Sequence, residues 1–206
     1  MKKFELTSDF ITNTFGVKLF RIKALVEFGN VKAGELGGYI EKEENLNQYG
    51  DAWVYGNAKV YGDAEVYGDA KVCGDAEVCG DAKVYGNAWV CGNAEVYGDA
   101  KVCGDAWVYG DAKVYGDAWV YGDAKVYGNA DYVTVKGFGS VFRTTSFFRE
   151  KNKSIGVKCG CFYGELDEFR DKVKETHGES KTAKEYLMLA DLIEYKFSEE
   201  IAAERK

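Results

Sequence analysis

The sequence predicts a mainly β protein built around a parallel β-helix, and one repeated six-residue word is the reason. From Val54 to Asp131 the order Val, Tyr or Cys, Gly, Asp or Asn, Ala and one variable residue recurs thirteen times without an insertion. A short fixed period means that each unit packs mainly against its neighbours, and a hexapeptide period is typical of a parallel β-helix. The chain also contains 25 Gly and no Pro, which suits a body whose backbone N–H groups are needed in hydrogen-bonded ladders.

Each six-residue word predicts one short strand followed by a corner. Its residues Ala, variable, Val, and Tyr or Cys follow the period-2 pattern of a strand with one buried face. We expect Ala and Val to point inward and the other two residues to point outward. The following Gly-Asp or Gly-Asn pair predicts a turn, because Gly adopts positive φ freely and Asn and Asp tolerate it.

The combination of small and branched inward residues, as in Ala58, Val60 and Ala64, resembles the left-handed parallel β-helix of the hexapeptide-repeat proteins. That resemblance implies a triangular coil of three hexads, so that residues 18 positions apart lie in one column along the axis. Neighbouring coils are then expected to stack at the strand spacing of about 4.8 Å.

The repeat decays towards the N-terminus, where we expect a cap. Gln48 falls in the Val position of an imperfect word, and further back Ile40 and Leu46 fall in the Ala position. A terminal coil must close an open end of stacked backbone, so departure from the consensus is expected there. We therefore predict an N-terminal β cap with an atypical first coil over residues 1–47, and the β-helix proper over residues 48–135.

Residues 136–206 are predicted to form a small C-terminal α+β cap with a helical hairpin. The strands expected at the end of the β-helix and in this cap are Tyr132–Lys136, Ser146–Arg149 and Ile155–Cys159. Beyond them the apolar period becomes helical, with a first helix ending near Gly178. Thr182 and Glu185 have the spacing of a capping box, which predicts a second helix running toward Ile201.

Charge is unevenly distributed along the chain. The net charge is −7, and between Gln48 and Asp131 eleven Asp and three Glu face six Lys, which gives −8 and leaves +1 for the flanks. A body that binds duplex nucleic acid should be basic, so we expect no direct nucleic-acid binding by this segment. Sorting the corners by eighteen places only Asp along one edge, termed here the acidic edge. Its members are Asp63, Asp81, Asp99 and Asp117.

Sorting the outward residues by eighteen also gathers three of the four Trp on one face, termed here the interaction face. Its members are Trp53, Lys71, Trp89, Trp107, Tyr109 and Lys125. Extensive exposed aromatic surface generally marks an interface. Cross-strand stacking alone also explains rows of Tyr and Trp. Self-association into a dimer or trimer, a foreign protein partner and sugar stacking are the further alternatives.

The six cysteines fall into two groups. Four of them take the outward position that Tyr holds elsewhere, namely Cys73, Cys79, Cys91 and Cys103. Although Cys73 and Cys91 share a column, neighbours in a parallel ladder rarely have the geometry of a disulfide, so we expect free thiols in a reducing compartment. Cys159 and Cys161 need two further ligands to make a zinc site. We expect neither a metal nor a cofactor.

The residue inventory argues against the enzymatic and ice-binding versions of this architecture. Hexapeptide-repeat acyltransferases use a catalytic His and usually a loop that extrudes from a coil, whereas His177 is the only His and the thirteen words have no insertion. The γ-class carbonic anhydrases bind zinc through three His. Ice-binding β-helices present ranks of Thr, which the repeat lacks. We therefore predict no catalytic residue, with a divergent acyltransferase as the enzymatic alternative.

Beyond the repeat, the order of segments resembles a group of hexapeptide-repeat proteins encoded by phages and prophages. The segments that carry this resemblance are Phe20–Leu25, Leu36–Ile40, Thr144–Phe148, Cys159–Phe162 and Lys172–Gly178. It implies a protein that binds and blocks a host machine, and it brings no catalytic residues with it. We expect a non-enzymatic interaction protein, most concretely an inhibitor of a host nucleic-acid-handling or defence enzyme whose basic channel the acidic body occupies. A structural assembly component is the other alternative.

The N-terminal segment has no apolar core of the kind that a secretory signal needs, and no stretch approaches the ~18 apolar residues of a membrane span. We therefore expect a cytoplasmic location, in the host cell if the protein is encoded by a phage, and no membrane partner.

Overall fold

The structure is a computed structural model that describes residues 2–139 and 142–198. The chain divides into two compact units. The first comprises Met1–Asp123 and Tyr127–Asn129, and the second comprises Ala124–Val126 and Ala130–Lys206. Each unit has its own apolar core.

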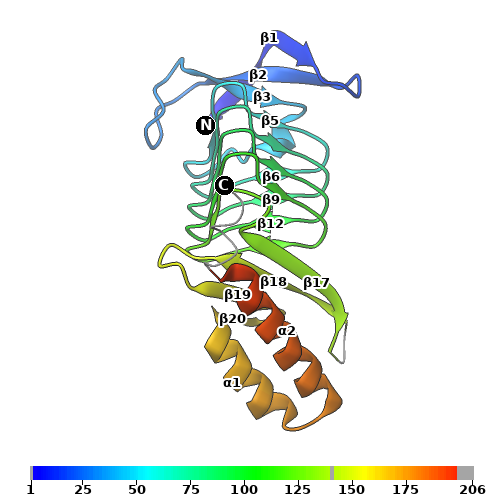
Figure 1. The fold of residues 1–206 in the computed structure, drawn as a ribbon. Coiled ribbons are helices and arrows are strands. Elements are labelled where there is room, and N and C mark those ends of the chain that lie inside the picture. Colours follow the sequence, from blue (N-terminus) through cyan, green and yellow to red (C-terminus); the bar gives the residue numbers. More distant parts are fainter. Residues whose placement is uncertain (1, 140–141, 199–206) are drawn as a thin grey trace. The chain divides into compact units, whose positions relative to one another are not determined.

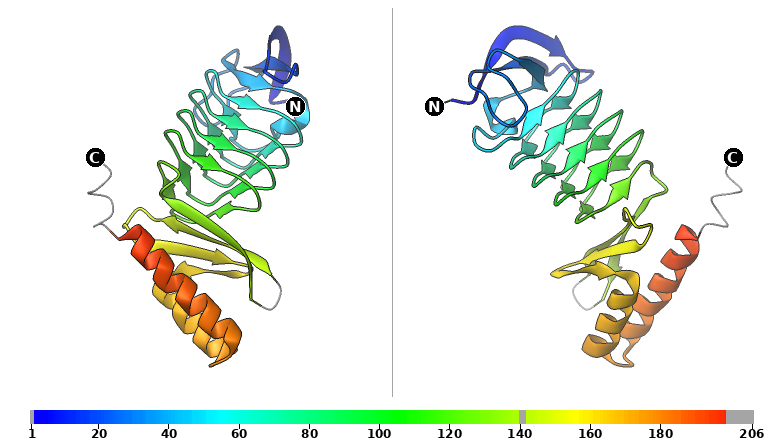
Figure 2. Two further views of the ribbon diagram at one scale, coloured as in Figure 1. Left: turned by 45° about the vertical axis from the view of Figure 1, so that its right-hand side comes forward. Right: turned by 90° about the vertical axis from the view of Figure 1, so that its left-hand side faces the viewer.

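The first unit is a parallel β-solenoid of about five turns with a spacing of 18 residues (Figure 1). Each repeated word contributes one two-residue strand, and Figure 2 shows these strands stacking turn upon turn. The strands are β4 (Trp53–Val54), β5 (Lys59–Val60), β6 (Glu65–Val66), β7 (Lys71–Val72), β8 (Glu77–Val78), β9 (Lys83–Val84), β10 (Trp89–Val90), β11 (Glu95–Val96), β12 (Lys101–Val102), β13 (Trp107–Val108), β14 (Lys113–Val114) and β15 (Trp119–Val120). One further strand of the same word, β16 (Lys125–Val126), is grouped with the second unit.

The strands of the first unit stack in three parallel columns. Their orders are β5-β8-β11-β14, β4-β7-β10-β13 and β6-β9-β12-β15. Trp89 pairs with Lys71 on one side and with Trp107 on the other, each 18 residues away. Regular backbone hydrogen bonds join the turns, such as the one from the Trp89 N–H to the Ala106 carbonyl at 2.9 Å. The predicted 18-residue register is confirmed.

The repeat Ala and Val side chains form the core of the solenoid, as predicted. From Ala52 to Val120 they are at most 1 % exposed. The glycines between the strands have positive φ, and Gly80 shows why another residue fits poorly there. Its φ is +71°, and a Cβ at this position would lie 2.9 Å from the backbone nitrogen of Gly98 in the next turn.

The N-terminal strands extend one column of the solenoid into an antiparallel sheet. β1 (Phe4–Thr12) pairs with β2 (Lys18–Ala24), and β2 pairs with β3 (Leu36–Ile40). β3 then joins β5 in parallel. Most side chains of β1 are exposed or half-buried, so its sequence shows no clean apolar alternation and the strand was not predicted.

The first turn differs from the predicted register. Ile40 pairs with Val60 and Leu46 pairs with Val66, so each lies 20 residues from its partner and takes the Val position, where the Ala position was predicted. Ile and Leu are too large for the narrow site that Ala fills in the other turns. The two extra residues lie between Leu46 and Trp53, because β4 already pairs with β7 at a spacing of 18.

The loop that holds the extra residues is fixed to the N-terminal strand. Gln48 does not take the predicted Val position, because Leu46 pairs with Val66 in its place. The Gln48 side-chain Oε1 instead accepts hydrogen bonds from the backbone N–H groups of Lys3 at 2.8 Å and Phe4 at 3.3 Å. The Lys3 ammonium donates to the carbonyls of Gly50 at 3.2 Å and Ala52 at 3.0 Å. Burial lowers the pKa of Lys3 to about 8. These bonds satisfy backbone groups that a stack of coils leaves open at its end.

The second unit contains an antiparallel sheet of order β17-β18-β19-β20. Its strands are β17 (Tyr132–Phe138), β18 (Arg143–Arg149), β19 (Ile155–Cys159) and β20 (Phe162–Glu165). The three predicted strands are confirmed, and β20 is an addition to them. Figure 1 shows the two helices lying beside one another below this sheet.

The helices are α1 (Leu166–His177) and α2 (Lys181–Phe197). Their inner faces share one apolar core with the sheet, in which Phe169 meets Tyr186 edge-on at 5.7 Å between ring centroids. The end of α1 agrees with the prediction.

The predicted cap of α2 is wrong. Ser180 is the N-cap, and its side chain accepts a hydrogen bond from the Ala183 N–H at 3.2 Å. Thr182 already lies inside the helix, because the turn after Gly178 closes two residues earlier than the Thr182 and Glu185 spacing suggests. Ile201, the predicted end of this helix, lies outside the described residues.

None of the helices within residues 2–139 and 142–198 has the length and apolar character that a membrane span requires.

Candidate functional site

The interaction face is brought together by the strand register. Trp53, Lys71, Trp89 and Trp107 follow one another along the column β4-β7-β10-β13. The rings of Trp89 and Trp107 stack at 5.4 Å with an angle of 18° between them, and the Lys71 ammonium lies 4.7 Å above the Trp89 ring. Tyr109 extends the stack, with its ring 5.5 Å from that of Trp107.

Two members of the interaction face differ from the rest. Trp53 is 0 % exposed, so the expectation that it contributes exposed surface is wrong. Phe4 and Phe28 cover it edge-on at 6.2 and 5.3 Å, because the N-terminal strands fold over the first turn. Lys125 lies in β16, which belongs to the second unit. The Trp, Lys and Tyr cluster of the first unit is therefore centred on Trp89 and Trp107.

Ion pairs neutralise the acidic residues on the strand faces. Lys59 meets Glu77 at 2.6 Å, and two further pairs of the same 18-residue spacing, Lys83 with Glu65 and Lys113 with Glu95, are formed at 2.8 Å. Each Glu of the repeat is thus paired with a Lys one turn away. Exposed pairs of this kind contribute little to stability, but they cancel the negative charge of the faces.

The corners retain negative charge that the strand faces lack. Between residues 51 and 125 the corners hold ten Asp, whereas the strand faces hold six Lys and three Glu. On two of the three edges, Asn side chains donate to Asp carboxylates of the next turn. These bonds are Asn57 to Asp75 at 3.2 Å, Asn87 to Asp105 at 2.8 Å and Asn93 to Asp111 at 3.0 Å. The solenoid therefore alternates acidic edges with weakly basic, aromatic faces.

Unlike the other two edges, the acidic edge contains only Asp, so no Asn side chain of this edge donates a hydrogen bond to its carboxylates. Asp63, at its N-terminal end, accepts a 2.6 Å hydrogen bond from the Lys42 ammonium, and this contact lowers the pKa of the Asp63 carboxyl. Asp81 and Asp99 are exposed. Asp117 lies two turns beyond Asp81 in the same column. The strand register places these four positions 18 residues apart, and Asp63 is paired with Lys42.

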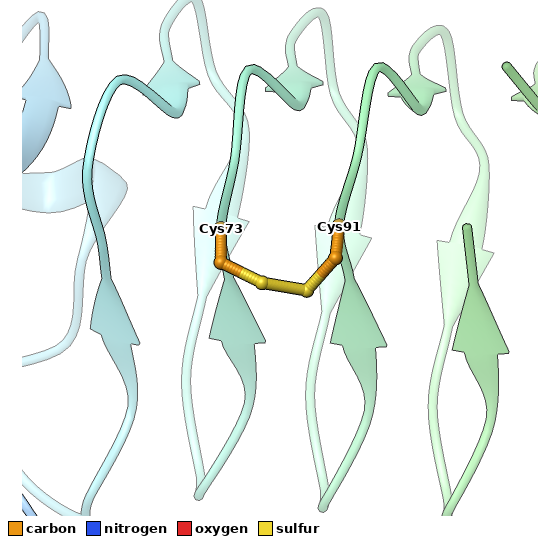
Figure 3. The surroundings of a disulfide bond; sticks show 2 residues. All are labelled: Cys73 and Cys91. Carbon is orange, nitrogen blue, oxygen red and sulfur yellow. A yellow bond between two sulfur atoms is a disulfide. The ribbon is translucent and has the colours of Figure 1, made fainter. Parts of the chain in front are cut away.

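Cys73 and Cys91 form a disulfide between neighbouring turns (Figure 3). The prediction of free thiols at these two positions was therefore wrong. Their Cα atoms are 4.6 Å apart, which is within the range that a disulfide can bridge, because strand neighbours in register already sit at this separation. Cys79 and Cys103 are not part of a disulfide.

The remaining two cysteines lie in the second unit. Cys159 ends β19, where its sulfur accepts a hydrogen bond from the Thr145 hydroxyl at 3.2 Å, and Cys161 is exposed in the turn before β20. In the part of the chain that the structure describes, no group of three or more His, Cys, Asp or Glu is placed to hold a metal ion.

His177 lines the same cavity as both of these cysteines. As the last residue of α1, it lines a cavity of about 370 Å³ in the second unit together with Cys159 and Cys161. The other lining residues are Arg143, Phe162, Phe169, Lys172, Val173, Thr176 and Tyr186. Sequence reasoning treated the Cys-Gly-Cys turn and the single His separately, and only the fold shows that they share one cavity.

Sequence reasoning also missed an apolar stripe on α2. Met188, Leu192 and Tyr195 are 72, 62 and 68 % exposed and lie one helical turn apart on one face of the helix. Leu192 and Tyr195 also border a second cavity of about 360 Å³. The signal was present in the sequence as a second apolar stripe at helical spacing, beside the stripe that contains the buried Leu189 and Ile193.

A scan against models of protein families found no match to this chain, and a search of curated proteins found none either.

Proposed function

We propose that the protein is a non-enzymatic interaction protein that binds a basic partner through the acidic edge of a left-handed solenoid with three hexads per coil. The observation that carries this proposal is the sorting of charge. The Glu side chains on the strand faces are paired with Lys, while ten Asp occupy the corners, of which Asp81 and Asp99 on the acidic edge are exposed. The negative potential is therefore concentrated in lines along the corners.

The spacing of the carboxylates suits a groove that normally holds a nucleic-acid backbone. Turns that stack at about 4.8 Å place like charges in a straight row, and unit charges at that distance repel by about 1 kcal/mol in water. A basic groove relieves this repulsion and gains charge-assisted contacts. The partner that fits is an enzyme that handles DNA or RNA, and the protein acts by occupying its groove.

The resemblance to phage-encoded hexapeptide-repeat proteins extends this proposal. A phage protein of this kind acts in the cytoplasm of the host cell, and a nuclease-based defence enzyme is then the most concrete partner. The stacked Trp89 and Trp107 offer a second surface, through which the chain binds itself as a dimer or trimer or holds the same partner.

The acidic edge is tested by removing its charge and keeping its shape. In a variant with Asp63, Asp81, Asp99 and Asp117 all changed to Asn, the corners keep a residue that already serves at other corners, such as Asn93. We expect this variant to fold normally and to bind host nucleic-acid enzymes at least tenfold more weakly in affinity capture. Wild-type binding should weaken with salt, because screening shortens to about 8 Å at physiological ionic strength, and added DNA should compete with it.

A charge-matched control separates the edge from net charge. Four exposed carboxylates of α1 and the turn after it can be neutralised instead: Asp167, Asp171, Glu175 and Glu179. This control should bind like the wild type. Equal binding by the acidic-edge variant and the wild type would reject the acidic edge as the contact. If changing Trp89 and Trp107 to Lys then abolished capture, the contact would lie on the interaction face.

A further inference from the structure

We infer that the cavity between β18, the β19–β20 turn and α1 in the second unit binds a small aromatic monocarboxylate. Its volume of about 370 Å³ lies within the range of about 300–1,000 Å³ that is typical of small-molecule pockets. This inference is independent of the acidic edge, because every lining residue belongs to the second unit.

The inner part of the cavity is aromatic. The ring of Phe169 meets those of Phe162 at 5.6 Å and Tyr186 at 5.7 Å, and Val173 completes the apolar wall. The His177 ring stacks on Tyr186 at 6.1 Å with an angle of 27°. Walls of this kind favour a flat ring as the occupant, because an aromatic ligand can add offset and edge-on contacts to the existing ones.

The tyrosine of this wall is a neutral group. Burial, followed by the proximity of Cys159, raises the pKa of Tyr186 to about 12, so its hydroxyl stays protonated at neutral pH. That hydroxyl donates to the Phe138 carbonyl at 3.3 Å. Tyr186 therefore contributes an apolar ring to the cavity and adds no negative charge that would repel an anion.

Arg143 is one of the two basic side chains, with Lys172, that line the cavity. Gly160 separates the two cysteines in the sequence. The Arg143 guanidinium lies directly against Gly160, since a side chain at this position would collide with it. The two other arginines in the described part of the second unit are already engaged: Arg149 meets Asp131 at 3.6 Å, and Arg170 meets three carboxylates at 2.7–2.9 Å. Among the described residues, Arg143 has no carboxylate within ion-pair distance.

One carboxylate is the anion that fits this arrangement. A guanidinium presents two parallel N–H donors that match a carboxylate. The second cation of the lining, Lys172, is already paired with Glu175 at 2.8 Å, so the cavity has the unpaired charge for one negative group. The carboxylate should lie on the Arg143 side, away from His177, because the C-terminal end of α1 repels anions.

The experiment uses 2-naphthoate as the probe and 2-naphthylmethanol as its neutral counterpart, with the full chain. Binding is read as protection of Cys161 from iodoacetamide, followed by mass spectrometry, with the solenoid thiol Cys79 as the internal control. We expect 2-naphthoate to protect Cys161 at a concentration at least tenfold lower than the alcohol does, and to leave Cys79 unaffected.

Variants assign the selectivity to one side chain. Arg143→Gln should bring 2-naphthoate to the level of the alcohol, and Arg143→Lys should restore part of the difference. Lys174→Gln is the matched control, because it removes a cation of α1 that does not line the cavity. Equal protection by the two probes, no protection of Cys161 at millimolar probe, or selectivity that survives Arg143→Gln would each overturn the inference.

Discussion

The variant Ala88→Leu should lose a large part of its stability. Ala88 is 0 % exposed and faces the axis of the solenoid, where every neighbouring turn places another Ala. Three extra carbon atoms in this space must push turns apart or force strained rotamers. Overpacking of this kind typically costs about 1–3 kcal/mol, and the regular backbone ladder leaves little room for local relaxation. Urea unfolding followed by circular dichroism measures the loss.

The matched control for this variant is Lys83→Leu. Lys83 is an outward residue of the preceding strand, so the same new side chain lies at the surface and only the exposed pair with Glu65 is lost. We expect a much smaller loss of stability than for Ala88→Leu, because an exposed ion pair contributes little. Equal midpoints for Ala88→Leu and the wild type would contradict the inward assignment of Ala.

Reduction of the Cys73–Cys91 disulfide should have the second large effect. The bond joins residues that are 18 positions apart in the sequence. For a loop of roughly 15 residues, the loss of loop-closure entropy in the unfolded chain corresponds to about 3 kcal/mol of stabilisation. We expect dithiothreitol to lower the free energy of unfolding by about this amount. The double variant Cys73→Ser and Cys91→Ser should show the same loss without reductant and should no longer respond to it.

The thiol Cys79 provides the control for this second prediction. It occupies the same outward position of the word but is not bonded, so Cys79→Ser should remain sensitive to reductant. Insensitivity of the wild type to reductant would show that the bond does not stabilise the protein.

The solenoid was predictable because its information is local. The word itself specifies a strand, a glycine corner and the inward Ala and Val, and the pairing of residues 18 apart follows once the words repeat without insertion. Positions such as Trp89 and Trp107 could therefore be placed side by side before any coordinates were known. The burial of Trp53 could not, because it depends on Phe4 and Phe28 folding over the first turn.

The six-residue repeat predicted the wrong register in the first turn, where the size of the side chains determines which inward position they take. Ile40 and Leu46 were assigned to the Ala position, yet their volume fits the Val position, and the chain accommodates this with two extra residues in the following loop. The disulfide was missed for a related reason. A general rule about parallel ladders was applied to Cys73 and Cys91, whose Cα atoms in fact lie 4.6 Å apart.

Some surface features likewise follow from the repeat, and others depend on tertiary packing. The acidic edge follows from the repeat alone, whereas the pairing of Asp63 with Lys42 depends on the irregular first turn. The cavity of the second unit could not be predicted, because Arg143, Cys159, Lys172 and His177 come from separate parts of its sheet and first helix. Only the packing of α1 against the sheet brings them together.

Carboxylate footprinting of the captured complex tests the acidic edge most directly. The protein alone and in complex with its partner is treated with a carbodiimide and an amine, and the labelled carboxylates are quantified by mass spectrometry. Asp81 and Asp99, which are exposed, should label readily in the free protein and at least tenfold more slowly in the complex. Glu175 on α1 should label equally in both. Unchanged labelling of Asp81 and Asp99 in a formed complex would contradict the proposal that the acidic edge fills the partner's groove.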